Sequence, residues 1–285
     1  MSAEGTRHAP PTGIGIGLRA ELAAELLALE PPEIRFLEVH PENYVRRGGR
    51  YAENLERALG RWPVITHGLT LCFGNVDGYD RAFLGELRAF LERVGTPWHS
   101  DHLCFAGAGG ALAHDLLPFP HDSAAVELCV QRIREMRDAI GREVAVENVS
   151  SYVIPKGTTM DEPTFVNEVL DRADAKILLD VNNVYVNAKN HGFDARAYID
   201  RIPAERVVQL HVAGHWLRKD GLRIDTHAEA ICEDVYALLE HTLERVGPVP
   251  VLLERDGNFP SFEALLSEVR RLDEIYRRAT GAAAA

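Results

Sequence analysis

Eight short apolar runs recur along the 285-residue chain, and longer segments with helical spacing separate them. The runs are rich in Val, Ile and Leu, which is typical of parallel strands buried on both faces. They cover residues 14–18, 34–39, 64–71, 98–105, 144–149, 177–181, 207–212 and 249–253. Eight strands, each followed by a helix, predict a closed (βα)8 TIM barrel. A doubly wound open sheet is the structural alternative.

The chain contains no long linker rich in Pro, Gly or Ser that would separate two domains. We therefore expect a single catalytic barrel domain over residues 13–279, with disordered ends at residues 1–12 and 280–285. Three connections are longer or more irregular than a minimal turn, and they cover residues 106–120, 182–194 and 213–226. All three follow expected strands, which is the face where barrel active sites are built.

Charge and hydropathy exclude several classes of partner. The chain has 43 acidic and 31 basic residues and a net charge of −12, so nucleic acid is not expected as a partner. No apolar run approaches the roughly 20 residues that span a membrane. Residues 1–11 lack the apolar core of a signal peptide, which predicts a cytoplasmic protein. The four cysteines form no CxxC pair, which argues against a zinc ribbon or a disulfide framework.

Charged and imidazole side chains stand at the ends of seven consecutive apolar runs. These ends are Glu38-Val39-His40, Thr66-His67-Gly68, Ser100-Asp101-His102, Glu147-Asn148, Asp180-Val181-Asn182-Asn183, His211 and Glu254-Arg255-Asp256. Each one alone is explained by a helix cap, an ion pair or a hydrogen-bonded core residue. Seven in succession need a shared cause, because an unpaired charge is costly to bury. A bound cation is the simplest cause, since it neutralises carboxylates and uses neutral imidazoles.

Further candidate ligands lie around the seventh run, namely Asn183, His215, Asp225 and His227. Asp225 and His227 are two residues apart, and in extended chain such residues point the same way, so both can reach one ion. Capping of a helix that begins near Ala228, by Asp225 or Thr226, is the alternative explanation. The donors are too many for a single ion, which favours two or three metal ions.

In this order along one chain, these motifs resemble the multinuclear non-heme iron-dependent oxidative enzymes, the family that contains the iron-binding subunit of methanobactin biosynthesis. The resemblance extends from about residue 13 to residue 272. It is carried by His67-Gly68, Ser100-Asp101-His102-Leu103, Leu116-Leu117-Pro118, Glu147-Asn148, Leu179-Asp180-Val181-Asn182-Asn183, His211-Val212-Ala213-Gly214-His215, Asp225-Thr226-His227 and Leu253-Glu254-Arg255-Asp256.

The resemblance implies a xylose isomerase-like barrel with two to three iron ions, in mixed ferrous and ferric states, and dioxygen as co-substrate. It implies one ion held by His67, His102 and Glu147. It implies a central ion held by Asp180, His211 and Glu254, with Glu147 as a bridge. A third ion would use Asn183, His215, Asp225 and His227. We assign the catalytic role to Glu147, Asp180 and His211.

Members of the resembled family act on ribosomally made peptides, most often at cysteine and often with a small partner protein that presents the peptide. The resemblance therefore implies oxidative modification of a cysteine in a ribosomally synthesised precursor peptide. Two other functions are compatible with the residues. One is a metal-dependent barrel of another chemistry, an aldose isomerase or a phosphodiesterase, and the other is a non-catalytic metal-binding scaffold. Metal analysis and an oxygen-consumption assay separate these alternatives.

Overall fold

The central strands of the protein close into a barrel. The computed structural model describes residues 10–282, and residues 1–9 and 283–285 of the ends expected to be disordered lie outside the described residues. The barrel strands are β1 (Ile14–Gly17), β2 (Phe36–Val39), β3 (Val64–His67), β4 (Trp98–His102), β7 (Glu143–Glu147), β8 (Lys176–Asp180), β9 (Val207–Val212) and β12 (Val251–Leu253). They pair in the closed order β1-β12-β9-β8-β7-β4-β3-β2, and every neighbouring pair is parallel. The predicted (βα)8 barrel is confirmed, and the open-sheet alternative is wrong.

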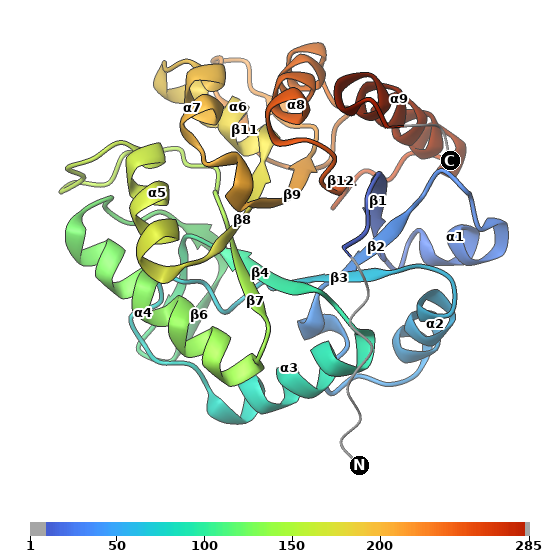
Figure 1. The fold of residues 1–285 in the computed structure, drawn as a ribbon, viewed down its shortest axis with the longest axis horizontal. Helices are drawn as coiled ribbons and strands as arrows, with labels where there is room; N and C mark the ends of the chain where they lie inside the picture. Colours follow the sequence, from blue (N-terminus) through green and yellow to red (C-terminus); the bar gives the residue numbers. More distant parts are fainter. Residues whose placement is uncertain (1–9, 283–285) are drawn as a thin grey trace.

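Helices surround the barrel strands (Figure 1). They are α1 (Ala23–Leu29), α2 (Arg50–Leu59), α3 (Arg81–Val94), α4 (Ser123–Ile140), α5 (Glu162–Ala173), α6 (Val181–His191), α7 (Ala195–Arg201), α8 (Glu233–Val246) and α9 (Phe262–Thr280), with the short 3-10 helices η1 (Pro41–Asn43) and η2 (Ala204–Arg206). In α3, Leu84, Leu87 and Leu91 are buried at helical spacing, and the Asp80 carboxylate accepts a hydrogen bond from the Ala82 backbone N–H. Among the described residues, none of the helices has the length and apolar character needed to cross a membrane.

Helix α6 replaces the irregular connection expected over residues 182–194. Its first eight residues are all buried, and Asn182, Asn183 and Asn187 are among them, so polar and apolar residues do not separate onto an exposed and a buried face in the sequence. Its asparagines bond to the segment after β7. Asn183 Nδ2 donates to the Asn148 carbonyl oxygen at 3.0 Å, and Asn187 Oδ1 accepts from the Ser151 N–H at 2.8 Å. The buried amides therefore fix the start of α6 against the end of the neighbouring strand.

The other two long connections form small hairpins. β5 (Phe105–Ala108) and β6 (Ala111–Leu117) pair antiparallel after β4. β10 (Trp216–Leu217) and β11 (Arg223–Ile224) pair antiparallel after β9. Because both hairpins follow barrel strands, they extend the face on which the carboxyl ends of the strands meet.

Helix α8 begins later than the sequence pattern suggests. Its first residue is Glu233, and Cys232 is the N-cap residue. The expected start near Ala228 is wrong, and so is the alternative that Asp225 or Thr226 caps this helix. The segment before α8 instead lies at the open end of the barrel, where Asp225 contacts other polar side chains.

Apolar side chains close the barrel interior at one level. This layer consists of Phe36, Ile65, Trp98, Ala145 and Leu252. A Cβ atom at Gly15 would lie 2.5 Å from the Phe36 ring, so only glycine leaves room for this ring. Two residues further along the same strands stand Glu38, His67, Ser100, Glu147 and Glu254. Since side chains i and i+2 of a strand share one face, these polar groups lie in the barrel interior, directly above the apolar layer.

Candidate metal centre

A first group of ligand atoms joins three adjacent strands. His67 ends β3, His102 ends β4 and Glu147 ends β7, and all three side chains are buried. His67 Nε2 and His102 Nε2 are 3.2 Å apart, and Glu147 Oε2 lies 2.9 Å from the first nitrogen and 3.3 Å from the second. Three donors that face one another at these distances suit a single metal ion among them.

Neighbouring side chains set the orientation of both imidazoles. His67 Nδ1 lies 2.9 Å from Ser100 Oγ, and His102 Nδ1 lies 3.3 Å from Asp101 Oδ1. The Asp101 carboxylate also accepts the Leu71 N–H at 3.1 Å, so its own position is fixed. In metal sites, a partner on one ring nitrogen holds the other nitrogen toward the ion. Both Nε2 atoms are presented in this way.

A second group lies beside the first and shares Glu147 with it. It consists of Glu147, Asp180, His211 and Glu254, whose ligand atoms all lie within 4.8 Å of one another. His211 Nδ1 is 3.0 Å from Glu254 Oε2 and 3.7 Å from Glu147 Oε1. Glu147 therefore directs Oε2 at the first group and Oε1 at the second. This is the arrangement that a carboxylate bridging two ions requires.

Glu38 orients His211 by contacting the ring nitrogen that faces away from the second group. Its Oε2 lies 2.9 Å from His211 Nε2 and accepts a hydrogen bond from Gln209 Nε2 at 2.7 Å. Burial opposes the ionisation of Glu38, but the adjacent His211 lowers the pKa of this carboxyl to about 2. An ionised Glu38 bound to Nε2 leaves Nδ1 of His211 directed at the second group.

The electrostatics of the second group favour a bound cation. Burial, together with the charges of Glu147 and Asp225, raises the pKa of Asp180 well above its usual value. Asp180 Oδ2 is buried without a hydrogen-bond partner in the described part of the chain, and so is Asn183 Oδ1. Unsatisfied buried oxygens are costly, and a metal ion satisfies them while it neutralises the carboxylates. The residues present therefore fit metal ions.

A third set of candidate ligands is less compact. Asp225 Oδ1 lies 2.8 Å from His227 Nε2, and His227 Nδ1 lies 3.4 Å from Glu254 Oε2. His227 has a φ of 47°, a strained value for a residue with a side chain and one often found at functional sites. His215 Nδ1 instead lies 2.9 Å from Asn182 Oδ1.

The remaining contacts show how far this third set comes together. The Asn182 amide also donates to Asp225 Oδ1 at 2.8 Å, so it links His215 to Asp225 indirectly. Asn183 is bonded to the Asn148 carbonyl oxygen. The resemblance assigns four residues to a third ion. Of these, Asp225 and His227 are in direct side-chain contact, whereas the described side-chain hydrogen bonds of His215 and Asn183 are with Asn182 and Asn148.

Sequence reasoning left several residues of the centre without a role. Glu38 and Asp101 were recognised as strand-end residues, but their contacts with the ligand imidazoles were not. The position of Asp101 directly before His102 was the available signal. Asp256 Oδ2 lies 2.9 Å from His227 Nδ1, and the Cys72 sulfur belongs to a compact group with Asp101 and His102. Nothing in the sequence indicates that Cys72 lies beside His102, because Cys72 is on a loop between β3 and α3 and not at the end of a strand.

One family model matches nearly the whole chain. The family model described as RiPP precursor modification enzyme MbnB/TglH/ChrH matches residues 13–277. The chain belongs to this family. The resemblance inferred from the sequence motifs is therefore confirmed at family level, and with it the general activity, modification of a RiPP precursor.

Individual relatives agree with this assignment. The chain is 42% identical over 270 residues to a UPF0276 protein of Anaeromyxobacter sp. (strain Fw109-5), and the match covers 95% of each protein. Among solved structures, it resembles a xylose isomerase domain protein from Planctomyces limnophilus, with a TM-score of 0.61, 15% identity and coverage of 96% of this chain and 100% of that one. It also covers 44% of a xylose isomerase-like TIM barrel/4-hydroxyphenylpyruvate dioxygenase fusion protein, with a TM-score of 0.61 and 16% identity. At these identities, the two structures show the fold alone.

Proposed function

We propose that this member of the family is a non-heme iron-dependent oxidoreductase that uses dioxygen to modify a cysteine in a ribosomally synthesised precursor peptide. The observation that carries the proposal is the pair of buried ligand groups that share Glu147 at the open end of the barrel. Family membership supplies the substrate class.

Two to three iron ions, in ferrous and ferric states, are the proposed cofactor. The proposed ligands are His67, His102, Glu147, Asp180, Asn183, His211, His215, Asp225, His227 and Glu254. The first group suits one ion and the second group suits another, with Glu147 between them. A third ion is the least supported, because described contacts join only part of its set. Mixed imidazole and carboxylate donors suit iron and leave positions open for substrate.

Bound iron supplies the redox chemistry and dioxygen activation that amino-acid side chains lack. The chain contributes orientation and exclusion of water. Asp101 and Glu38 hold the rings of His102 and His211, as described above. The apolar layer beneath the site offers water no hydrogen-bonding side chain except the Trp98 indole N–H, which already donates to Gln209. Because the ligand groups are buried, water screens them little, and this strengthens the electrostatic contacts between the ligands and the ions.

The face around the site suits a peptide and a protein partner. Ten large apolar side chains are exposed in the described residues, and seven of them lie on segments between the end of a barrel strand and the next helix. They are Leu69, Val76, Tyr152, Val153, Ile154, Trp216 and Leu217. Exposed apolar side chains that gather on one face are typical of interaction surfaces. This supports a small partner protein that presents the precursor peptide.

Metal analysis and peptide mass spectrometry test the proposal. Protein purified without air is expected to contain at least two iron ions per chain. With oxygen, a partner and a precursor peptide encoded by a neighbouring gene, it should consume oxygen and change the mass of the peptide. A Cys→Ser peptide should stay unmodified, and free cysteine should not be consumed. Fully active protein that contains only zinc would contradict the role of iron, and modification of the Cys→Ser peptide would contradict the role of cysteine.

A further inference from the structure

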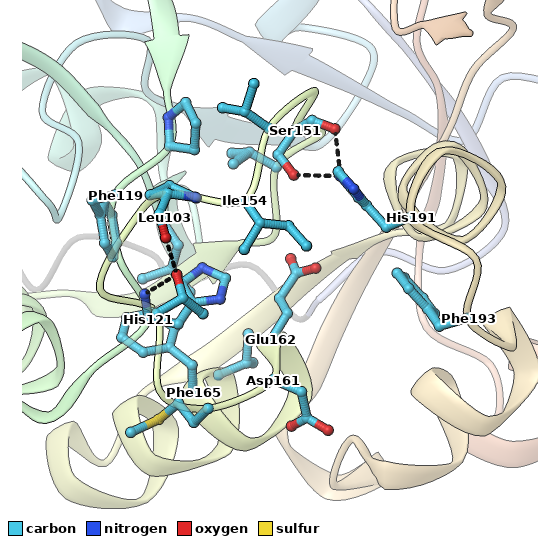
Figure 2. A pocket seen from close by; sticks show the side chains of 17 residues that line it. Leu103, Phe119, His121, Ser151, Ile154, Asp161, Glu162, Phe165, His191 and Phe193 are labelled. Atoms are coloured by element: carbon cyan, nitrogen blue, oxygen red, sulfur yellow. Dashed lines mark hydrogen bonds between the residues drawn. The ribbon is translucent and has the colours of Figure 1, made fainter.

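An apolar cavity opens beside the metal centre. It has a volume of about 220 Å³, and Figure 2 shows the side chains around it. Much of its wall is formed by Leu103, Phe119, Val149, Ile154, Phe165 and Phe193. Cavities that bind small-molecule ligands typically measure about 300–1,000 Å³, so this one is sized for a single side chain.

The cavity is connected to the first ligand group through the backbone. Leu103 directly follows His102, and Val149 lies two residues after Glu147. The Leu103 N–H donates to the Glu147 carbonyl oxygen at 2.8 Å. An extended peptide advances about 3.3 Å per residue. A substrate residue at the metal centre therefore brings a neighbour one to three positions away within reach of the cavity.

One carboxyl group projects into this apolar space. Glu162, in the first turn of α5, extends between Ile154 and His191 (Figure 2). Asn187 Nδ2 donates a hydrogen bond to its Oε2 at 3.3 Å. Burial raises the pKa of Glu162 to about 7, and the contacts of the carboxyl group with the Asn187 amide and the Tyr198 hydroxyl offset this only in part.

No cation of the cavity wall compensates this carboxyl group. The described lining residues include neither Lys nor Arg, and their two imidazoles belong to His121 and His191. His191 directs Nε2 at the Ser151 carbonyl oxygen, 2.9 Å away, and not at Glu162. The His121 ring stacks on Phe165 with 4.6 Å between ring centroids, and burial lowers its pKa to about 4, so it is neutral at pH 7. The adjacent Asp161 is paired with Arg201 outside the cavity. Glu162 is thus an acid without a counter-ion inside an apolar cavity.

We propose that this cavity is a substrate subsite that binds a basic side chain, lysine or arginine, of the peptide near the residue to be modified. The aliphatic stem packs against the apolar wall, and the cationic end pairs with Glu162. A neutral apolar side chain fills the same space but leaves the carboxyl group unpaired. The peptide context of this assignment rests on the proposed function, whereas binding of a cation with an aliphatic stem does not.

Methionine NMR tests the subsite without metal or turnover. The chain has three methionines, of which Met160 lines the cavity and Met136 is fully buried in α4. With 13C-labelled methionine methyl groups, n-butylammonium at pH 8 should shift the Met160 signal and leave the Met136 signal in place. We expect it to bind about tenfold more tightly than n-butanol, the value of a charge-assisted hydrogen bond. Lowering the pH from 8 to 6 should weaken the amine about tenfold and leave the alcohol unchanged, because Glu162 becomes protonated.

Two matched variants locate the effect. Glu162→Gln should abolish the preference for the amine. Asp161→Asn removes the same charge one residue away and keeps a residue suited to capping α5, so it should retain the preference. Equal binding of amine and alcohol to the wild type would overturn the proposal. So would a preference that survives in Glu162→Gln, or a Met160 signal that neither probe moves.

The peptide provides the second arm of the test. Replacement of each Lys or Arg within three positions of the modified residue by norleucine should raise KM about tenfold at one position in the wild type, and have little effect in Glu162→Gln. If the amine binds but no such position exists, the substrate subsite is wrong. If no peptide is modified by iron-loaded enzyme while the amine still binds, the proposed function fails and the cation site remains.

Discussion

Replacing Gly68 with alanine should damage the metal centre through its supporting shell. Gly68 follows His67, and a Cβ atom there would lie 2.3 Å from Asp101 Oδ2 and 3.2 Å from His99 Nε2. Asp101 is completely buried and cannot move toward solvent. Overpacking of this kind costs about 1–3 kcal/mol. Displacing Asp101 also weakens its bond with the Leu71 N–H, and a hydrogen bond to a charged group contributes about 1.5–3 kcal/mol.

We therefore expect Gly68→Ala to lower the free energy of unfolding of the metal-free protein by about 2–4 kcal/mol. Because Asp101 orients His102, the iron content of the purified variant should fall as well. Urea denaturation measures the first effect and elemental analysis the second. Gly85→Ala is the matched control, since nothing lies within 4 Å of a Cβ atom at this position in α3. It should stabilise the protein by about 0.5–1 kcal/mol.

The reasoning would be refuted by a Gly68→Ala variant that unfolds within about 0.5 kcal/mol of the wild type and carries its full iron content. That result would mean that Asp101 is free to shift without loss, and that it does not position His102. A loss of stability with normal iron content would separate the packing effect from the effect on the metal centre.

Three further predictions concern other residues. His211→Ala and Glu254→Gln should each abolish turnover and retain the far-UV circular dichroism of the barrel, because residues at strand C-termini serve chemistry more than stability; near-normal activity in either would disprove the central ion. Glu38→Gln should reduce iron affinity about 10–100-fold in a chelator competition, since it weakens the contact that orients His211; unchanged affinity would refute this role. Glu162 has a pKa of about 7 against an ordinary value of 4.5, so its ionisation destabilises the fold progressively as the pH rises from about 4.5 to 7, by at most about 3 kcal/mol. Glu162→Gln should therefore be more stable than the wild type at pH 8 and about equally stable at pH 4, as urea denaturation would show; an equal gain at both pH values would contradict this.

The barrel was predictable because its strands carry a strong local signal. A run such as that in β8 is buried on both faces, so nearly every residue in it is apolar until the strand ends at Asp180. Helix α6 was not predictable for a related reason. Its first eight residues are buried and its asparagines bond to neighbouring backbone, so it lacks the two-sided pattern by which helices are recognised.

The sequence likewise predicted one part of the candidate site, the ligands at the strand ends, but not the contacts that support them. The polar ends of β3, β4 and β7 follow from the order of residues, and the structure brings His67, His102 and Glu147 together. The contact between Glu38 and His211 joins positions 173 residues apart, and only the closed barrel creates it. The basic-residue subsite was also beyond reach, since its wall comes from several separate segments and Glu162 resembles an ordinary first-turn acid of a helix.

The apolar layer beneath the ligands leaves the carboxyl ends of the strands as the side from which the ligand groups are reached. Under the proposed function, iron, dioxygen and peptide would share this side of the barrel. A peptide whose side chain occupies the adjacent cavity would then lie in the path of metal exchange. We therefore expect metal loading to precede substrate binding, and bound peptide to slow the removal of iron by a chelator.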